Sequence, residues 1–388
     1  MEINLTYSKT EQILEKLISF STVSRNSNLE LIHYIEGYLA NLGISSSLIL
    51  NEEKTKANLY AKLGPQDVPG IMLSGHTDVV PVDGQDWSVD PFCMTLKANK
   101  LYGRGTTDMK GFIASVLAVL PKAITMDLKT PLELAFSYDE EIGCVGVKDM
   151  IKMLESTNKA PAFCIVGEPT SMQVAVAHKG KTAATCTCIG VEAHSALTDK
   201  GLNAIYLATE MIQGIRGVQQ RMKLNNEHDH HYDVPYTTLH VGTIEGGTAL
   251  NIIPRQCEFK FEIRNIQSDN PKDILEEIEQ LAESIVSEYN NTFPSAEIRI
   301  DIFNQYPALD TSPEEPVVTF VQGLMETDEF IKLAFGTEGG LFQSRLGTAT
   351  VVCGPGSMDQ GHKPDEFIYR SELQRCDLFL GRLLKHIS

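Results

Sequence analysis

The sequence of 388 residues lacks the features of a secreted, membrane or nucleic-acid-binding protein. Its N-terminus has no basic stretch followed by an apolar core, so we predict no secretory signal. No apolar run approaches the roughly 20 residues that a membrane-spanning helix needs. Acidic residues outnumber lysine and arginine by 51 to 33, and the formal charge of −18 argues against the basic patches that nucleic acids require. We therefore expect a cytoplasmic protein that binds neither membranes nor nucleic acids.

The eight cysteines never form a C-x-x-C pair, the spacing typical of zinc ribbons and redox sites. Cys186 and Cys188 alternate on one face of a predicted strand, and the other cysteines lie in apolar runs. We expect buried, reduced thiols, as is usual in the cytoplasm. A phosphate-binding loop is also missing, because the glycine-rich segment 354–357 lacks the Lys-Ser or Lys-Thr pair of such loops.

Histidines and acidic residues are present where four short apolar runs end. Such runs are typical of buried strands. The runs and the polar residues that follow them are 71–73 with His76, 132–138 with Glu140 and Glu141, 163–166 with Glu168, and 350–353 with His362. In open α/β sheets, ligands bind beyond the carboxyl ends of the strands. We therefore expect these side chains to meet at one edge of a sheet.

Asp108 precedes a predicted helix at 111–123, and its carboxylate offers two oxygens. A turn histidine beside a helix-capping aspartate would be the simpler interpretation, but it does not account for four strand ends of the same kind. Two metal ions about 3.5–4 Å apart need a bridging carboxylate and further ligands on each side. We expect Asp108 to bridge two ions. His76 and Glu141 would complete one site, and Glu168 and His362 would complete the other.

Glu140 and Asp78 are left without a metal ion. Successive residues of a strand point to opposite sides, so Glu140 would face the attacking water while its neighbour Glu141 binds metal. A carboxylate in that position takes a proton from the water and delivers it to the leaving amine. Asp78, two residues after His76, would hold the imidazole ring of that ligand, as a second carboxylate commonly does.

These residues resemble the family of di-zinc aminoacylases and carboxypeptidases, and the resemblance spans nearly the whole chain. The segments that carry it are SGHTDVVP at 74–81, GRGTTDMKG at 103–111, DEEIG at 139–143, GEP at 167–169 and GH at 361–362. The resemblance implies two zinc ions, for which cobalt can substitute, the roles assigned above, and a cis peptide bond after Asp108. Among the family's activities it favours removal of the acetyl group from N-acetylornithine, an N-acyl amino acid. The alternatives are another aminoacylase, a desuccinylase, a dipeptidase or a binding protein that has lost catalysis.

From residue 180 the predicted elements follow the order strand, helix, strand, strand, helix, strand, which is the ferredoxin-like unit. We expect an α/β fold with a catalytic domain of residues 1–179 and 306–388, built on a mostly parallel central sheet flanked by helices. The ferredoxin-like domain, residues 180–305, would be inserted into it. The resemblance implies that this insertion is a lid and that it forms a homodimer.

The insertion carries its own candidate residues. His194, in segment 190–195, resembles the family histidine that polarises the scissile carbonyl, and in dimeric relatives this residue acts in the partner subunit. Asn251 lies in the matching segment 246–254. Arg264 is suited to bind a substrate carboxylate with paired N–H groups, although a surface ion pair is the alternative. The segment His228-Asp229-His230-His231 looks like a metal site, but it lies in a polar loop and we expect it to be solvated.

Thr337, Glu338 and Gly339 lie in a glycine-rich loop before an apolar turn around Leu341. Free N–H groups at the start of a helix favour anions, so this loop would hold one end of the substrate. Glu338 would supply a negative charge for the other end. The alternative is that Glu338 only caps the following turn.

Overall fold

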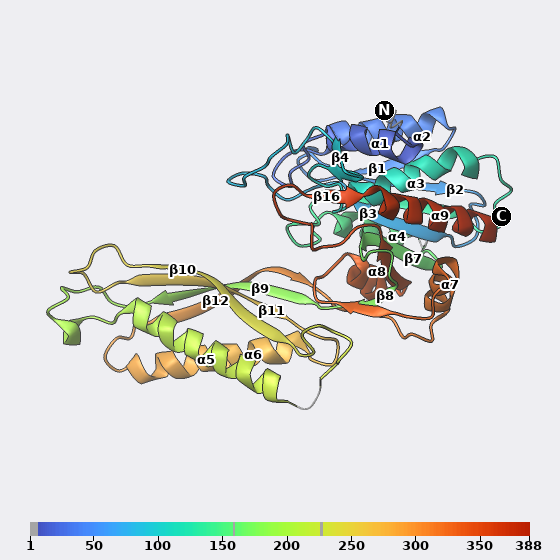
Figure 1. The fold of residues 1–388 in the computed structure, drawn as a ribbon. Helices are drawn as coiled ribbons and strands as arrows, with labels where there is room; N and C mark the ends of the chain where they lie inside the picture. The colour runs from blue at the N-terminus through green and yellow to red at the C-terminus, as the bar shows by residue number, and fades with distance from the viewer. Residues whose placement is uncertain (1–6, 158–159, 226–227) are drawn as a thin grey trace. The chain divides into compact units, whose positions relative to one another are not determined.

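The computed structural model describes residues 7–157, 160–225 and 228–388, which form two compact units (Figure 1). The first unit comprises Met1–Ala177, Leu309–Lys332 and Thr337–Ser388. The second comprises His178–Ala308 and Leu333–Gly336. The chain therefore leaves the first unit to build most of the second, returns, and adds Leu333–Gly336 to the second unit before it completes the first.

The first unit is organised around a sheet that has nine strands within the described residues. The strands are β1 (Ser46–Leu50), β2 (Ala57–Leu63), β3 (Ile71–His76), β6 (Leu132–Ser137), β7 (Phe163–Pro169), β8 (Ala175–His178), β13 (Leu309–Asp310), β14 (Ile331–Leu333) and β15 (Ala349–Gly354). Their order is β1-β2-β6-β3-β7-β15-β8-β13, with β14 beside β8. The central strands β6, β3, β7 and β15 are parallel, whereas β1, β2 and β8 pair antiparallel.

Helices flank this sheet. They are α1 (Lys9–Ile18), α2 (Leu29–Asn41), α3 (Lys110–Ala123), α4 (Val147–Thr157), α7 (Pro316–Met325), α8 (Gly339–Leu346) and α9 (Arg370–His386). α3 packs against β3, β7, α1 and α9, and α8 packs against β7 and β15. All residues of β3 and β6 are buried, as is typical of strands that are covered on both faces. The predicted α/β fold is confirmed, and the parallel strands are those at the centre.

A small antiparallel sheet stands apart from the large one. It consists of β4 (Thr95–Lys97), β5 (Lys100–Tyr102) and β16 (Phe367–Tyr369), in the order β16-β5-β4. Phe367 of β16 is opposite Tyr102 of β5. The pairing joins two segments of the chain that are about 260 residues apart and that continue directly into the loops of Asp108 and His362.

In its described residues, the second unit contains a four-stranded antiparallel sheet and two long helices. Its elements are β9 (Lys181–Ile189), a short 3₁₀ helix (Thr198–Lys200), α5 (Ala204–Leu224), β10 (Thr238–Gly246), β11 (Gln256–Arg264), α6 (Pro271–Tyr289) and β12 (Glu297–Tyr306). The strand order is β10-β11-β9-β12, so the predicted ferredoxin-like arrangement is confirmed. Asn203 and Asn270 cap α5 and α6 by accepting backbone N–H groups, as is usual at helix starts.

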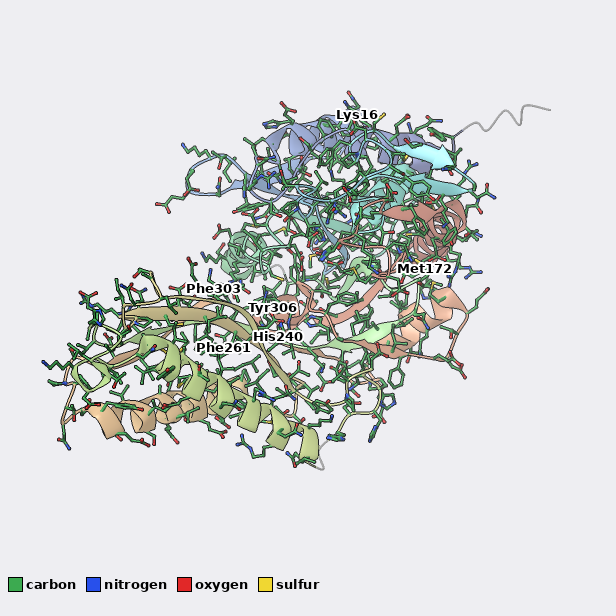
Figure 2. All side chains as sticks on the ribbon, turned by 60° about the vertical axis from the view of Figure 1, so that its left-hand side comes forward. Lys16, Met172, His240, Phe261, Phe303 and Tyr306 are labelled. Atoms are coloured by element: carbon green, nitrogen blue, oxygen red, sulfur yellow. The ribbon has the colours of Figure 1, made fainter. Side chains whose placement is uncertain are left out.

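The core of the second unit lies between this sheet and both helices (Figure 1). Phe259 and Phe261 of β11 are buried there, whereas Phe303 of β12 is 60% exposed (Figure 2). Strand residues alternate between the two faces of a sheet, so one face of this sheet packs against the helices. Ile244, Ile302 and Phe303 are exposed.

All eight cysteines are free thiols, and all but Cys93 are buried. The predicted burial is therefore wrong for Cys93 alone. Cys188 and Cys257 stand opposite each other on paired strands without a disulfide. Across the parts of the chain that the structure describes, no helix is both long and apolar enough to cross a membrane.

Candidate metal centre

His76, Asp108 and Glu168 form a buried cluster at the carboxyl edge of the parallel strands. His76 is the last residue of β3, and Glu168 lies near the end of the neighbouring strand β7. The Nε2 atom of His76 is 3.0 Å from Oδ1 of Asp108 and 3.5 Å from Oε1 of Glu168. Three potential ligand atoms therefore face one point.

A second cluster shares Asp108 and adds Glu141 and His362. The Nε2 atom of His362 lies 3.1 Å from Oδ2 of Asp108 and 3.0 Å from Oε2 of Glu141. The two carboxylate oxygens of Asp108 thus face different histidines. A carboxylate shared in this way is the arrangement expected of a bridge between two cations.

The predicted grouping of the outer ligands is wrong. We expected His76 with Glu141 and Glu168 with His362, whereas the structure groups His76 with Glu168 and Glu141 with His362. β3 lies between β6 and β7, so its end neighbours both strands. Glu168 is part of β7 itself, whereas Glu141 lies in the turn beyond β6, where it meets His362.

Asp78 orients His76 through its backbone carbonyl. The Nδ1 atom of His76 donates to this carbonyl oxygen at 2.9 Å, whereas the Asp78 carboxylate is 3.6 Å away. Because Nδ1 donates to the carbonyl, Nε2 is the ring atom that faces Asp108, and loss of the Nε2 proton would leave a lone pair there for a metal ion. The carboxylate of Asp78 instead accepts the hydroxyl of Ser24 at 2.7 Å and the backbone N–H of Glu140 at 3.1 Å.

Glu140 and Glu141 have different surroundings, as expected, although both lie in a turn after β6 and not on the strand. Glu141 belongs to the second ligand cluster, and Glu140 belongs to neither. The Oε1 atom of Glu140 accepts the thiol of Cys144 at 3.3 Å. Among the residues that the structure describes, no histidine, lysine or arginine forms an ion pair with Glu140, which lies beside the clusters.

Several acidic side chains lie close together around these clusters, and burial and their neighbours shift their pKa values. Burial raises the pKa of Glu140 to about 8; His76 opposes the shift and Glu141 reinforces it. Burial also raises the pKa of Glu141 to about 7. Burial disfavours charge on Asp108, but hydrogen bonds from His362 and His76 hold its pKa well below the ordinary value. The charged Asp108 carboxylate therefore favours a positive charge beside each of its two oxygens, where the imidazoles of His76 and His362 lie.

The donor set fits two divalent cations. Buried carboxylates normally pair with cations or coordinate metals, and His, Asp and Glu are the nitrogen and oxygen ligands of zinc. The Oε1 atom of Glu141 is buried and has no hydrogen-bond partner within the described part of the chain, so it is available to bind an ion. The peptide bond between Asp108 and Met109 is cis, as the family resemblance implies.

The loop of Thr337, Glu338 and Gly339 differs from the prediction. The N–H of Gly339 is bonded to the hydroxyl of Thr337 at 3.0 Å, so this donor is not free for a substrate anion. Glu338 is 1% exposed and makes no side-chain cap at the start of α8. Its Oε2 atom accepts the hydroxyl of Ser74 at 3.3 Å, which brings the carboxylate to β3, two residues before His76.

Sequence reasoning missed two residues that support the clusters. Ser24 donates its hydroxyl to the Asp78 carboxylate, and no motif of the sequence assigned it a role. Glu366 accepts the backbone N–H of Asp108 at 3.1 Å. The signal for Glu366 was an acidic residue four positions after His362, which is no signature by itself.

The remaining predicted residues belong to the second unit. Segments 190–195 and 246–254 lie side by side there, because His194 forms a β-bridge with Ile252 and the N–H of Ser195 donates to the carbonyl of Asn251. His194 is exposed, and its Nδ1 accepts the N–H of Ala196 at 3.1 Å. An accepting Nδ1 carries no proton, so in the neutral ring the proton is on Nε2.

Arg264 is already engaged within the second unit. It donates to the hydroxyl of Tyr306 at 2.8 Å and lies 3.2 Å from the carboxylate of Glu262. Its pKa is raised because these two partners outweigh the opposing effect of burial. About a quarter of its side chain is exposed (26%), so part of the guanidinium faces solvent.

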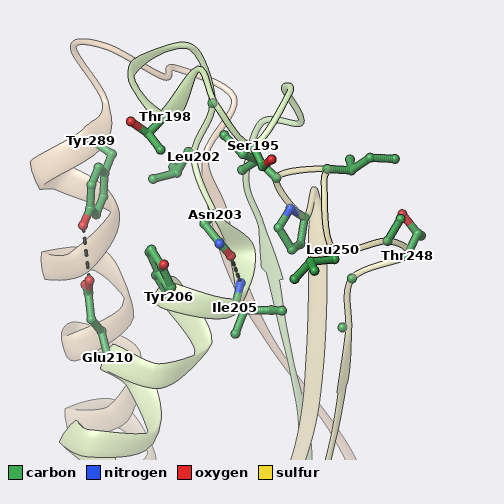
Figure 3. Close-up of a pocket in the computed structure, with 17 residues that line it drawn as sticks. Ser195, Thr198, Leu202, Asn203, Ile205, Tyr206, Glu210, Thr248, Leu250 and Tyr289 are labelled. Carbon is green, nitrogen blue, oxygen red and sulfur yellow. Dashed lines mark hydrogen bonds between the residues drawn. The ribbon is translucent and has the colours of Figure 1, made fainter.

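A groove of about 770 Å³ lies in the second unit, beside the start of α5 (Figure 3). Tyr289 donates to Glu210 at one side of it, and Asn203 caps α5 near its centre. The loop with Thr248 and the fully exposed Leu250 lines the opposite side. The groove is therefore open and partly apolar.

The histidine-rich segment at 228–231 forms no metal cluster with the other described residues. His230 and His231 are exposed, in line with the expected solvated loop, and His231 contacts Asp229. His228 differs, because it is half-buried and its ring lies 5.4 Å from that of Tyr236.

The chain is similar to known proteins over most of its length. The model of peptidase family M20/M25/M40 matches residues 72–386. The chain is 32% identical over 361 residues to an acetylornithine deacetylase of Proteus mirabilis, covering 93% of the chain and 90% of that protein. It is 33% identical over 343 residues to an acetylornithine deacetylase of Salmonella heidelberg, covering 88% and 86%. A metallo-carboxypeptidase from Sulfolobus solfataricus shares the fold with a TM-score of 0.80 at 19% identity, over 98% of this chain and 99% of that one.

Proposed function

Because the chain belongs to peptidase family M20/M25/M40, we propose that it is a two-metal amide hydrolase that converts N-acetylornithine to ornithine and acetate. Metal-dependent amide hydrolysis is the chemistry that its relatives support, and the acetyl and ornithine parts of the substrate rest on relatives named acetylornithine deacetylase. The observation that carries the metal centre is that the two oxygens of Asp108 face His76 and His362.

We expect zinc in both sites, with cobalt able to replace it. His76, Asp108 and Glu168 would hold one ion, and Asp108, Glu141 and His362 would hold the other. When bound, two such cations polarise the amide carbonyl and lower the pKa of a water molecule. The ring of His76 is fixed by the Asp78 carbonyl, so its ligand atom is preoriented.

Glu140 is the proposed general base. It takes a proton from the attacking water and delivers it to the nitrogen of the leaving amine. Burial, which raises its pKa, favours a group that accepts a proton near neutral pH. Its backbone is fixed by the hydrogen bond from its N–H to Asp78.

His194 is the proposed donor to the carbonyl oxygen of the substrate. The residue is exposed, and in its neutral ring the proton is expected on Nε2, since Nδ1 accepts a backbone N–H. Asn251 comes beside it through the bond between its carbonyl and Ser195. Arg264 is the proposed partner of the substrate's α-carboxylate.

We propose a homodimer formed through the second unit, in which His194 acts in the partner subunit. β10 is an edge strand, and no strand pairs with its outer side within the described ranges. Ile244 and Leu250 near this edge are 54% and 101% exposed, and Tyr206 of α5 is 67% exposed. Unpaired edge strands with apolar side chains favour association.

Free, mostly buried thiols suit a reducing compartment, so we propose arginine biosynthesis in the cytoplasm as the setting.

The test is release of the free amino acid from a panel of N-acyl amino acids, with the protein stripped of metal and then reloaded with zinc or cobalt. We expect activity only after reloading and the highest kcat/KM for N-acetylornithine. A higher kcat/KM for a succinylated substrate would replace the proposed activity with that of a desuccinylase. Two bound ions without hydrolysis of any member of the panel would favour the binding-protein alternative.

A further inference from the structure

Glu366 holds the backbone of the loop that carries Asp108. Its side chain is fully buried, and its carboxylate accepts the N–H groups of Gly105 at 3.1 Å, Thr107 at 2.9 Å and Asp108 at 3.1 Å. The same carboxylate accepts the guanidinium of Arg104 at 2.6 Å. Four donors from one short loop converge on one side chain. The position of the Asp108 backbone therefore depends directly on Glu366.

The small sheet fixes both ends of this contact. β16 begins directly after Glu366, and β5 ends directly before Gly103. The N–H of Gly103 donates to the backbone carbonyl of Glu366 at 2.9 Å, and the hydroxyl of Thr107 donates to the carbonyl of Phe367 at 2.8 Å. The loop and the segment of Glu366 are thus held as one piece.

Further hydrogen bonds connect Glu366 to His362 through Arg104 and Gln85. Arg104 donates to the side-chain oxygen of Gln85 at 2.6 Å, and Trp87 donates to the same oxygen at 3.1 Å. The side-chain nitrogen of Gln85 donates to the backbone carbonyl of His362 at 3.0 Å. The indole of Trp87 also lies against the Arg104 guanidinium, 5.1 Å away. Both ends of the Gln85 amide therefore have fixed partners.

We propose that Glu366, Arg104 and Gln85 are positioning residues, which set the distance between Asp108 and His362 before metal binds. None of the three belongs to a ligand cluster. The inference rests on the proposed two-metal function. Residues that orient metal ligands commonly change metal affinity by about 10–100-fold when they are altered.

The two metal sites depend on this network to different degrees. His76 ends a buried strand, whereas the side chain of His362 is 48% exposed and its backbone has a φ of +59°. A non-glycine residue in that conformation needs support from its surroundings. The Gln85 amide supplies a hydrogen bond to the His362 carbonyl, so Gln85 affects the site of His362 and leaves that of His76 intact.

Gln85→Glu is the sharpest test. The new side chain still accepts from Arg104 and Trp87, but it loses the donor to His362 and places a carboxylate oxygen against the His362 carbonyl. Gln85 is only half-buried, so the fold tolerates the change. In calorimetric titration of the metal-free protein with zinc, we expect one ion to bind as in the wild type and the other about 10–100-fold more weakly. Two unchanged affinities would overturn the inference.

Glu366→Gln, which weakens the support of the shared ligand Asp108, should lower the affinity for both ions. The matched control is Glu11→Gln, because Glu11 is also buried and accepts an arginine, Arg370, at 2.7 Å between α1 and α9. Glu11→Gln should lower Tm and leave both affinities unchanged. Equal affinities in the two variants would mean that Glu366 only stabilises the fold, which contradicts the proposal.

If Glu366→Gln does not fold, the zinc affinities of Gln85→Glu alone test the proposal. Fewer than two ions in the wild type would instead refute the two-metal function.

Discussion

The backbone N–H of Glu140 donates a 3.1 Å hydrogen bond to the carboxylate of Asp78. The backbone carbonyl of the same aspartate accepts Nδ1 of His76 at 2.9 Å. One residue therefore fixes both a candidate metal ligand and the proposed base. Substitutions of Asp78 and Glu140 therefore test metal binding and proton transfer separately.

Glu140→Ala should keep two ions per chain and lose most turnover. General bases contribute about 10²–10⁴-fold to rates, and Glu140 belongs to neither ligand cluster. The measurement pairs metal content by elemental analysis with kcat on N-acetylornithine. A wild-type kcat, or the loss of one ion, would show that Glu140 is not a base that acts apart from the metals.

Asp78→Asn should reduce kcat by about 10–100-fold, as other changes around metal ligands do. The amide keeps one acceptor oxygen but loses the charge that receives the hydroxyl of Ser24 and the N–H of Glu140. Ser24→Ala is the matched control, since it removes one of these donors and leaves the carboxylate. If the two variants lose the same activity, the charge of Asp78 has no part in catalysis.

The grouping of the outer ligands predicts metal content in double variants. Replacing His76 and Glu168 together by alanine should remove one ion and leave the other, and replacing Glu141 and His362 should do the same. Replacing His76 and His362 should remove both. The grouping inferred from sequence predicts instead that the first pair of changes damages both sites. Metal content after exhaustive dialysis distinguishes the two arrangements.

The family resemblance and the fold could be predicted because their signals are local. Apolar runs such as that at 163–166 identify buried strands, and the histidines and acids directly after them identify the edge where they meet. The strands β9 to β12 and the helices α5 and α6 of the second unit are long, so their periodicity is clear. The three-residue strands β4, β5 and β16 are too short for periodicity to reveal.

The missed contacts depend on partners far apart in the sequence. Glu366 and Asp108 are separated by 258 positions, and Ser24 and Asp78 by 54. β3 has both β6 and β7 beside it, and His76 groups with Glu168 because Glu168 lies on β7 itself, whereas Glu141 lies in the turn beyond β6 and meets His362. Local sequence therefore provides the ligands, while the course of the strands and loops in space determines which of them share an ion.

His194→Ala should lower kcat by about 10²–10³-fold, as loss of a donor to the oxyanion does in other hydrolases. His194 is exposed in the second unit and takes part in no ligand cluster, so metal content should stay at the wild-type value. Kinetics and metal analysis on the same preparation provide the check. A loss of metal would mean that His194 acts on the centre and not on the substrate.

Mixing His194→Ala chains with Glu140→Ala chains tests the action of His194 across subunits. In a heterodimer, one of the two centres has an intact Glu140 and receives an intact His194 from the partner. We expect recovery of up to half of the wild-type kcat per dimer. A purified heterodimer without recovery would place both residues in the same subunit.

Glu338 tests which substrate the centre prefers. Its carboxylate is buried beside Ser74 on β3, and burial raises its pKa to about 7, an effect that the nearby His76 opposes. N-acetylornithine carries a side-chain ammonium, which a fixed negative charge attracts. A succinyl group carries a carboxylate, and like charges at a binding site cost up to several kcal/mol.

Glu338→Gln keeps the shape and removes the charge. It should lower kcat/KM for N-acetylornithine about tenfold more than for N-acetylmethionine, whose side chain is neutral; this difference corresponds to about 1.4 kcal/mol. Ser74→Ala is the control, because it removes the hydrogen-bond donor to Glu338 and leaves the charge, so it should affect both substrates equally. Equal losses with Glu338→Gln would mean that the carboxylate supports β3 near His76 and that discrimination between substrates depends on other residues.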